Sequence, residues 1–172
     1  MIITRGHAVR RLFAALPFAA ALAAVQPIPA EAASFREAWT EAGSHCFARL
    51  YDSRHLASHP RQRLTRFSLS DSDGANPVDP GTFDVDFDFS IKGDSEVFGS
   101  VATCRDAPGA VHCVIEADGG EFTMRRDGPN LLLKISRMEV EGPEDFSPDL
   151  AVGGDDRVVR LFPSPRNACR SE

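Results

Sequence analysis

The chain has 172 residues, of which 42% are hydrophobic and 26% are charged, and its net charge at neutral pH is −6. This length suits a single domain built around one hydrophobic core. The acidic balance argues against nucleic acid as the main partner, because binding to a phosphate backbone requires a basic surface.

The N-terminal 32 residues have the three zones of a cleavable secretory signal. Three arginines and no acid precede an apolar run of about 14 residues, and Ala30 and Ala32 then supply the small residues that a signal peptidase requires. The apolar run is short for a membrane-spanning helix, which needs about 20 residues. We therefore expect cleavage after Ala32, a periplasmic or secreted protein, and no stable membrane span in the mature form.

Cleavage would leave residues 33–172 as a single domain. It removes three of the 19 basic residues and one of the 25 acidic residues, so the mature chain has 16 basic and 24 acidic side chains and a net charge of −8. This balance again disfavours nucleic acid as a partner. Ser34 and Glu37 fit a capping box, and the apolar residues that follow have helical spacing, which predicts a short helix over 35–42.

All four cysteines lie in the mature chain, and an even number in an oxidising compartment predicts two disulfides. Cys104 and Cys113 lie symmetrically about Pro108-Gly109, so a hairpin that turns there places them opposite each other. The remaining pair, Cys46 with Cys169, would close most of the domain and contribute up to about 5 kcal/mol. Metal ligation is the disfavoured alternative, because the sequence has no C-x-x-C spacing.

After Gln62 the hydrophobic pattern changes to period two. The strongest strand signal is 83–91, where five apolar residues alternate with four polar ones. Further strands are predicted at about 65–69, 95–104, 110–117, 120–126, 131–141 and 157–162. Seven short strands separated by turn signals predict an all-β fold, an antiparallel barrel or barrel-like sandwich with a short N-terminal helix.

Two polar segments of the predicted domain have ordinary structural interpretations. Asp84, Asp86 and Asp88 are expected to form one solvated sheet face whose charges discourage edge-to-edge pairing. Residues 143–156 hold two prolines, two glycines and several acids, and are expected to form a long surface loop.

The segment from Arg49 to Arg66 contains five arginines, two histidines and one acid in an otherwise acidic chain. Guanidinium groups bind carboxylate and phosphate bidentately, so this segment is a candidate site for an anionic ligand. The candidate ligand-binding residues are Tyr51, Asp52, His55, His59, Arg61 and Arg63. The alternative is a solvated face that pairs with the acidic segment after it.

The same segment permits a second chemical interpretation. If 52–59 were helical, Asp52, His55 and His59 would share one face as a three-ligand metal set or an acid/base group. The H-x-x-x-H spacing lacks the internal Glu of metalloproteases, and Pro60 argues against a helix there. The structural alternative is that both histidines pin a loop to the barrel through hydrogen bonds.

Enzyme motifs are otherwise absent: there is no G-x-S-x-G, no glycine-rich phosphate loop after a strand, and no cysteine left over as a nucleophile. We therefore expect a non-enzymatic binding or envelope-accessory domain that needs no cofactor and takes an unidentified small or anionic ligand. The alternative is a metal-binding protein or metal-dependent enzyme that uses Asp52, His55 and His59.

The segment Cys46 to Ser70, with Tyr51-Asp52-x-x-His55-Leu56-x-x-His59-Pro60-x-Gln62 at its centre, resembles a group of small secreted bacterial proteins of unknown function. The later Cys113…Asp118-Gly119-Gly120 segment and the closing Arg157…Cys169-Arg170 are similar in placement. The resemblance covers most of the mature chain and brings no activity, substrate or cofactor with it. It implies only that the histidine- and arginine-rich segment should be tested first.

Overall fold

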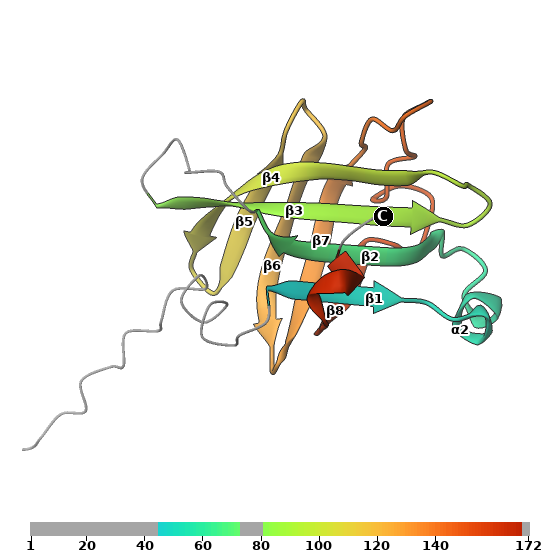
Figure 1. The fold of residues 1–172 in the computed structure, drawn as a ribbon, viewed down its shortest axis with the longest axis horizontal. Coiled ribbons are helices and arrows are strands. Elements are labelled where there is room, and N and C mark those ends of the chain that lie inside the picture. Colours follow the sequence, from blue (N-terminus) through green and yellow to red (C-terminus); the bar gives the residue numbers. More distant parts are fainter. Residues whose placement is uncertain (1–44, 73–80, 170–172) are drawn as a thin grey trace, which may run out of the picture. The chain divides into compact units, whose positions relative to one another are not determined.

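The computed structural model describes residues 45–72 and 81–169, all of which belong to the unit Ala32–Glu172 (Figure 1). The predicted signal segment, residues 1–32, and the predicted helix over 35–42 lie outside the described residues. Within the described ranges, no helix is both long and apolar enough to cross a membrane.

Eight antiparallel strands form a closed barrel in which each strand pairs with the next and the last pairs with the first. This confirms the all-β prediction and selects the barrel over the sandwich. The strands are β1 (Cys46–Leu50), β2 (Leu64–Asp71), β3 (Thr82–Ile91), β4 (Val97–Ala107), β5 (Ala110–Ile115), β6 (Gly120–Asp127), β7 (Asn130–Met138) and β8 (Val158–Pro163).

The eighth strand is β1, which the hydrophobic pattern did not predict. In β1 both Cys46 and Phe47 are buried, and the residues that follow them are partly buried or exposed, so the period-two alternation is missing. The other described elements are the helix α2 (Ser53–Ser58), between β1 and β2, and a 3₁₀ helix, Arg166–Cys169.

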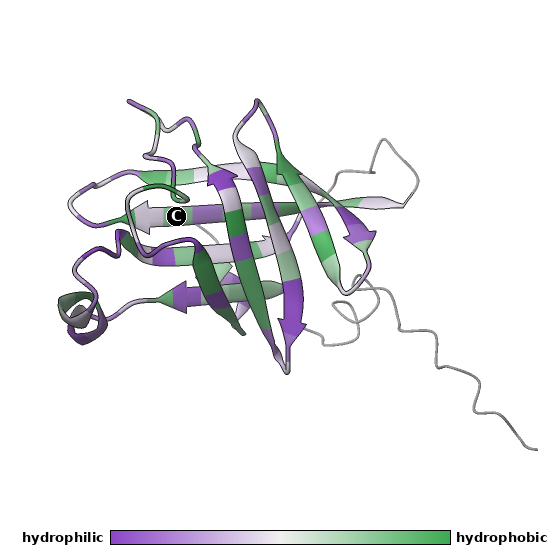
Figure 2. Cartoon of the chain, turned by 180° about the vertical axis from the view of Figure 1, so that it is seen from behind, coloured by the Kyte–Doolittle hydropathy of each residue, from purple (hydrophilic) through white to green (hydrophobic). Residues whose placement is uncertain are grey.

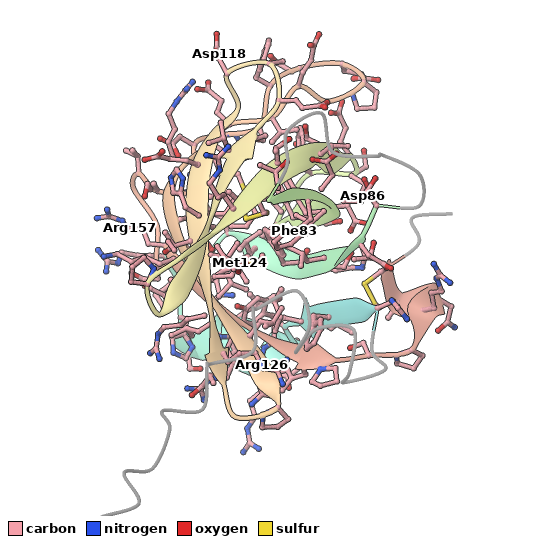
Figure 3. The ribbon with its side chains drawn as sticks, turned by 90° about the vertical axis from the view of Figure 1, so that its left-hand side faces the viewer. Phe83, Asp86, Asp118, Met124, Arg126 and Arg157 are labelled. Atoms are coloured by element: carbon pink, nitrogen blue, oxygen red, sulfur yellow. A yellow bond between two sulfur atoms is a disulfide. The ribbon has the colours of Figure 1, made fainter. Side chains whose placement is uncertain are left out.

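Alternation along the strands places one row of side chains inside the barrel. Figure 2 shows this as hydrophobic and hydrophilic bands that alternate along the ribbon. In Figure 3, Phe83 and Met124 lie within the ring of strands, whereas Asp118 and Arg157 lie at its periphery. An eight-stranded barrel has an interior that side chains can fill. The largest fully buried side chains include Phe47, Phe67, Phe89, Phe98 and Phe122.

The aspartates of β3 are not one solvated face, so that prediction was wrong for Asp88. Asp88 is buried because Arg66 and Ser68, on the neighbouring strand β2, both hydrogen-bond its Oδ1. The same arginine donates to the carbonyl of Ala168 at 2.7 Å, which joins the 3₁₀ helix to the outer face of the barrel. Because β3 pairs on both sides in a closed barrel, its charges have no open edge to protect.

Both predicted disulfides are present. Cys104 and Cys113 face each other across the β4–β5 hairpin with a Cα–Cα distance of 4.0 Å, and the hairpin turns through the two residues Pro108 and Gly109. Cys46 and Cys169 have a Cα–Cα distance of 5.8 Å and a sequence separation of 123. The second bridge therefore fixes the 3₁₀ helix to the first residue of β1.

The predicted surface loop between β7 and β8 is present, and it is anchored in the barrel. Leu150 is fully buried, and the side chain of Asp149 accepts a hydrogen bond from the backbone N–H of Met138 at 3.0 Å. At the end of the loop, Asp156 is only 1% exposed. The loop therefore covers one end of the core and brings a buried carboxylate to the start of β2.

The junction of β1 and β8 is the shortest pairing in the barrel. Only Phe47↔Pro163 and Ala48↔Phe162 are paired there, whereas β1 continues to pair with β2 as far as Leu50. Beyond Ala48 the first strand has therefore separated from the last. We call this opening the seam.

Candidate binding pocket at the seam

A pocket of about 390 Å³ lies along the seam. Its lining comes from β1 and the turn after it, from α2 and the residue that follows the helix, and from the outer faces of β7 and β8. The lining residues are Arg49, Tyr51, His55, His59, Gln62, Leu132, Asp155, Val158, Arg160 and Phe162. Three of the candidate residues from the sequence, Tyr51, His55 and His59, are therefore brought together in one pocket.

The helix that carries the two histidines forms despite Pro60. Asp52 is its N-cap, and its Oδ1 accepts a hydrogen bond of 2.7 Å from the backbone N–H of His55. The helix ends at Ser58, so Pro60 lies beyond the last helical residue and does not interrupt any helical hydrogen bond. The sequence argument against a helix was therefore wrong, and Asp52 has a capping role.

His55 is held by a buried glutamine. The side-chain Nε2 of Gln62 donates to the carbonyl of Leu64 at 3.2 Å, so Gln62 Oε1 faces His55 Nε2 at 2.9 Å. Because an amide oxygen only accepts, this arrangement assigns a proton to Nε2 of His55. His55 therefore pins α2 to the start of β2, as the structural alternative predicted. His59 instead hydrogen-bonds within its own helix, from Nδ1 to the carbonyl of His55 at 2.9 Å.

The aromatic and guanidinium groups of the pocket form one continuous chain of contacts. The guanidinium carbon of Arg49 lies 5.1 Å from the ring centroid of Phe162 and 4.8 Å from that of Tyr51. The Tyr51 ring lies 4.9 Å from His55, and the His55 ring stacks on His59 at 4.1 Å with an interplanar angle of 15°. Cation–π contacts with these two rings restrict the position of the Arg49 side chain.

The contacts of Tyr51 in the pocket shift the pKa of its hydroxyl group. Burial raises the pKa of Tyr51 above its ordinary value of 10.0, because the phenolate would be desolvated. The positive charge of Arg49 and side-chain hydrogen bonds to Gln62 and Arg49 act in the opposite direction and lower the pKa. Desolvation is the larger effect, so Tyr51 stays protonated at neutral pH and presents a hydroxyl group to its neighbours.

Two of the predicted ligand-binding arginines are paired with aspartates of the β7–β8 loop. Arg63 Nε donates to Asp156 Oδ2 at 2.9 Å, and the backbone N–H groups of Arg63 and Leu64 donate to Asp156 Oδ1 at 3.0 Å each. Arg61, which is largely exposed, pairs with Asp155 at 2.5 Å. Arg61 and Arg63 thus attach the β7–β8 loop to β2, and neither side chain lines the pocket.

Arg49 is a pocket cation that no carboxylate of the described residues neutralises. Arg160 pairs with Asp127 at 2.9 Å, and the pocket carboxylate Asp155 is paired with Arg61. Within the ranges 45–72 and 81–169, no carboxylate forms an ion pair with Arg49, whose contacts are the rings of Tyr51 and Phe162 and a hydrogen bond to the tyrosine. Arg49 is the first residue of the basic segment, and the sequence did not identify it as a ligand-binding candidate. Its position in the pocket becomes visible only where β1 separates from β8.

The structure does not assemble Asp52, His55 and His59 as a metal site. Asp52 caps the helix, His55 bonds Gln62 through Nε2, and the two imidazoles stack face to face. In the described part of the chain, no group of three or more His, Cys, Asp or Glu side chains is arranged to hold a metal ion.

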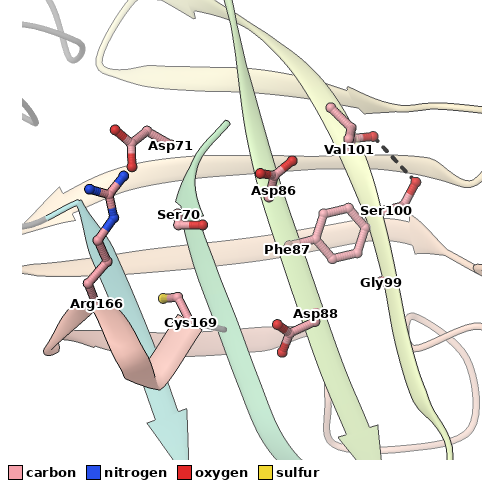
Figure 4. Close-up of a pocket in the computed structure, with 10 residues that line it drawn as sticks. All are labelled: Ser70, Asp71, Asp86, Phe87, Asp88, Gly99, Ser100, Val101, Arg166 and Cys169. Atoms are coloured by element: carbon pink, nitrogen blue, oxygen red, sulfur yellow. Dashed lines mark hydrogen bonds between the residues drawn. The ribbon is translucent and has the colours of Figure 1, made fainter. Parts of the chain in front are cut away.

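A second hollow of about 500 Å³ lies on the outer face of β2, β3 and β4, beside the 3₁₀ helix (Figure 4). It is lined by the aspartates Asp71, Asp86 and Asp88, and Arg166 points toward Asp71. These charges have partners of their own. Asp88 is bound by Arg66, and Asp71 Oδ2 lies 2.8 Å from His45 Nδ1. Asp86 and Arg166 are also engaged, so the seam pocket is the better candidate for a ligand.

Comparison with known proteins adds no functional assignment: no protein-family model matches the chain, and no curated protein or solved structure matches it significantly. The resemblance to small secreted bacterial proteins therefore stays a prediction. The pocket itself is therefore the basis for a functional proposal.

Proposed function

We propose that the protein is a non-enzymatic binding domain whose seam pocket takes a small anionic ligand. The observation that supports this most strongly is Arg49, a cation that contacts two aromatic rings and has no carboxylate partner among the described residues. A guanidinium fixed in this way can present its remaining N–H donors to a carboxylate or phosphate without losing much side-chain freedom.

The rest of the pocket favours an anion that also has an apolar part. Leu132, Val158 and Phe162 line the pocket, and Val158 is 53% exposed. Ligand sites commonly combine an apolar lining with a few polar groups that fix orientation. Arg49 would hold the anionic group, and the apolar side chains would contact the remainder of the ligand.

The test uses three probes of similar size: benzoate, phenyl phosphate and benzylammonium. Isothermal titration calorimetry should detect benzoate and phenyl phosphate binding and no benzylammonium binding. Arg49→Gln should weaken anion binding roughly 10- to 100-fold, because a charge-assisted hydrogen bond contributes about 1.5–3 kcal/mol.

The matched control is Arg54→Gln, which removes the same charge from an exposed position on α2 that does not line the pocket. Arg54→Gln should leave the affinity nearly unchanged. Equal binding of the anions and benzylammonium, or equal losses in Arg49→Gln and Arg54→Gln, would refute the proposal.

We also propose that the protein works outside the cytoplasm, in the periplasm or after secretion. The two disulfides and the three-zone N-terminal segment support this location. Mass spectrometry of the extracytoplasmic fraction should give a mature N-terminus at Ala33, within a residue or two. An intact N-terminal signal segment on a membrane-held product would refute export with cleavage.

A further inference from the structure

The last strand has backbone groups that face the seam. β8 pairs with β7 from Leu131↔Leu161 to Lys134↔Val158, and the N–H of Ile135 donates to the carbonyl of Arg157 at 2.8 Å. In an antiparallel ladder, successive residues direct their N–H and C=O groups to opposite sides. Because Arg157 bonds β7, the backbone groups of Val158 and Arg160 point to the other side, toward β1.

On that side the ladder with β1 ends too early to reach them. Ser164 donates to the carbonyl of Cys46 at 2.9 Å, and Phe162 is paired with Ala48. The next positions of the ladder would join Arg160 to Leu50, but β1 has separated by then, and no such pair exists. Over the described ranges, the N–H and C=O groups of Val158 and Arg160 thus have no partner strand.

This unpaired edge opens into the seam pocket, because Val158 and Arg160 both line it. An unpaired strand edge is a template for another extended chain, whose backbone can complete the ladder. Leu50, on the opposite side of the opening, is 76% exposed. The opening thus combines backbone donors and acceptors with an apolar surface and the cation of Arg49.

We propose that the seam binds an extended peptide that pairs with β8 at Val158 and Arg160 and places a carboxylate on Arg49. This inference rests on the proposed anion pocket and specifies its ligand class. The carboxylate can come from an acidic side chain or from a free C-terminus, since both present the same group. Four backbone hydrogen bonds at two positions, together with the ion pair, would fix the register of the peptide.

A second copy of this chain fits the edge less well. A two-fold pairing of β8 with β8 would bring two copies of Arg160 close together, and like charges on paired strands are destabilising. No carboxylate of the described residues pairs with Arg49, and the β8–β8 pairing would not supply one. Charge complementarity therefore favours a short acidic or C-terminal peptide segment.

The experiment measures peptide binding by calorimetry. The probes are acetyl-Glu-Val-Thr-Val-amide, which has an acidic side chain, and acetyl-Thr-Val-Thr-Val with a free C-terminus. At least one should bind, and the one that does identifies the source of the carboxylate. Two further versions of the binding peptide have alternate amides N-methylated. Because only alternate N–H groups can face β8, one version should bind at least about tenfold more weakly and the other nearly normally.

The variant Val158→Pro tests the same edge by a change in the protein and not in the peptide. It removes one N–H that faces the seam, at the first residue of a strand, where proline is tolerated, and should weaken peptide binding at least about tenfold. If benzoate binds through Arg49 but no peptide binds, or both methylated versions bind equally, the peptide inference is wrong and the anion pocket stands. If benzoate does not bind at all, the proposed function itself is wrong.

Discussion

Asp156 and Arg63, 93 residues apart in the sequence, form a buried ion pair in which Arg63 Nε lies 2.9 Å from Asp156 Oδ2. The other carboxylate oxygen accepts backbone hydrogen bonds from Arg63 and Leu64, so both oxygens of this buried group bind residues at the start of β2. We expect Asp156→Ala to lower the free energy of unfolding by roughly 3–5 kcal/mol, because it leaves a partly buried guanidinium and two backbone donors without their acceptor. Urea denaturation measures the loss.

The control for this prediction is the neighbouring residue. Asp155→Ala removes an ion pair with Arg61 that lies near the surface, and should cost less than about 1 kcal/mol. Equal losses for the two variants would show that the burial of Asp156 does not matter. That outcome would contradict the anchoring of the β7–β8 loop, which supplies Asp155 to the pocket lining.

The two histidines of the pocket should differ in their contribution to stability. His55→Ala leaves the buried Gln62 Oε1 without its donor and should cost roughly 1–3 kcal/mol. His59→Ala removes a hydrogen bond at an exposed helix end and should stay within about 0.5 kcal/mol. Thermal melts with and without Zn²⁺ provide the measurement. A wild-type melt that Zn²⁺ raises by several degrees, with no such shift in either variant, would favour the metal hypothesis instead.

Tyr51 is the only tyrosine of the chain, so its titration can be followed directly by tyrosinate absorbance. Burial raises its pKa, so the midpoint for the folded protein should lie above 10.0 and return to about 10 in denaturant. Arg49→Gln should raise the midpoint further, because the positive charge of Arg49 favours the phenolate. A folded midpoint at or below 10.0 would contradict the desolvation of Tyr51 in the pocket.

The same pKa shift fixes the sign of a pH effect on stability. A pKa that is higher in the folded protein than in the unfolded chain stabilises the fold below the unfolded value, near pH 10. This contribution is lost as the pH rises through the folded value. Denaturation of wild type between pH 9 and 11 should show the decline, and Tyr51→Phe should lack that part of it.

The alternation of apolar and polar residues in the sequence was sufficient to predict most strands of the barrel. The run over β3 shows why: five apolar residues alternate with polar ones, and the observed strand covers Thr82–Ile91. The symmetric placement of Cys104 and Cys113 likewise predicted their register, which the structure confirms. Patterns of this kind predict a strand or a register from neighbouring residues alone.

The pocket was only partly predictable because its shape depends on contacts distant in the sequence. Tyr51, His55 and His59 could be found from their motif, whereas Arg160 and Phe162 come from β8 and carry no local signal. Arg63 looked like a ligand residue because its partner Asp156 lies far away in the chain. Separation of β1 from β8 after two paired positions has no signature in either strand alone.

The most direct test of the anion pocket is an NMR titration that follows the side-chain Nε–H signals of the arginines while benzoate is added. We expect the largest shift at Arg49, which has no carboxylate partner among the described residues, with backbone shifts at Tyr51 and Val158, which line the same pocket. Arg54, which is exposed on α2, should hardly move. Equal small shifts at Arg49 and Arg54, or a largest shift at another arginine, would contradict an anion pocket at Arg49.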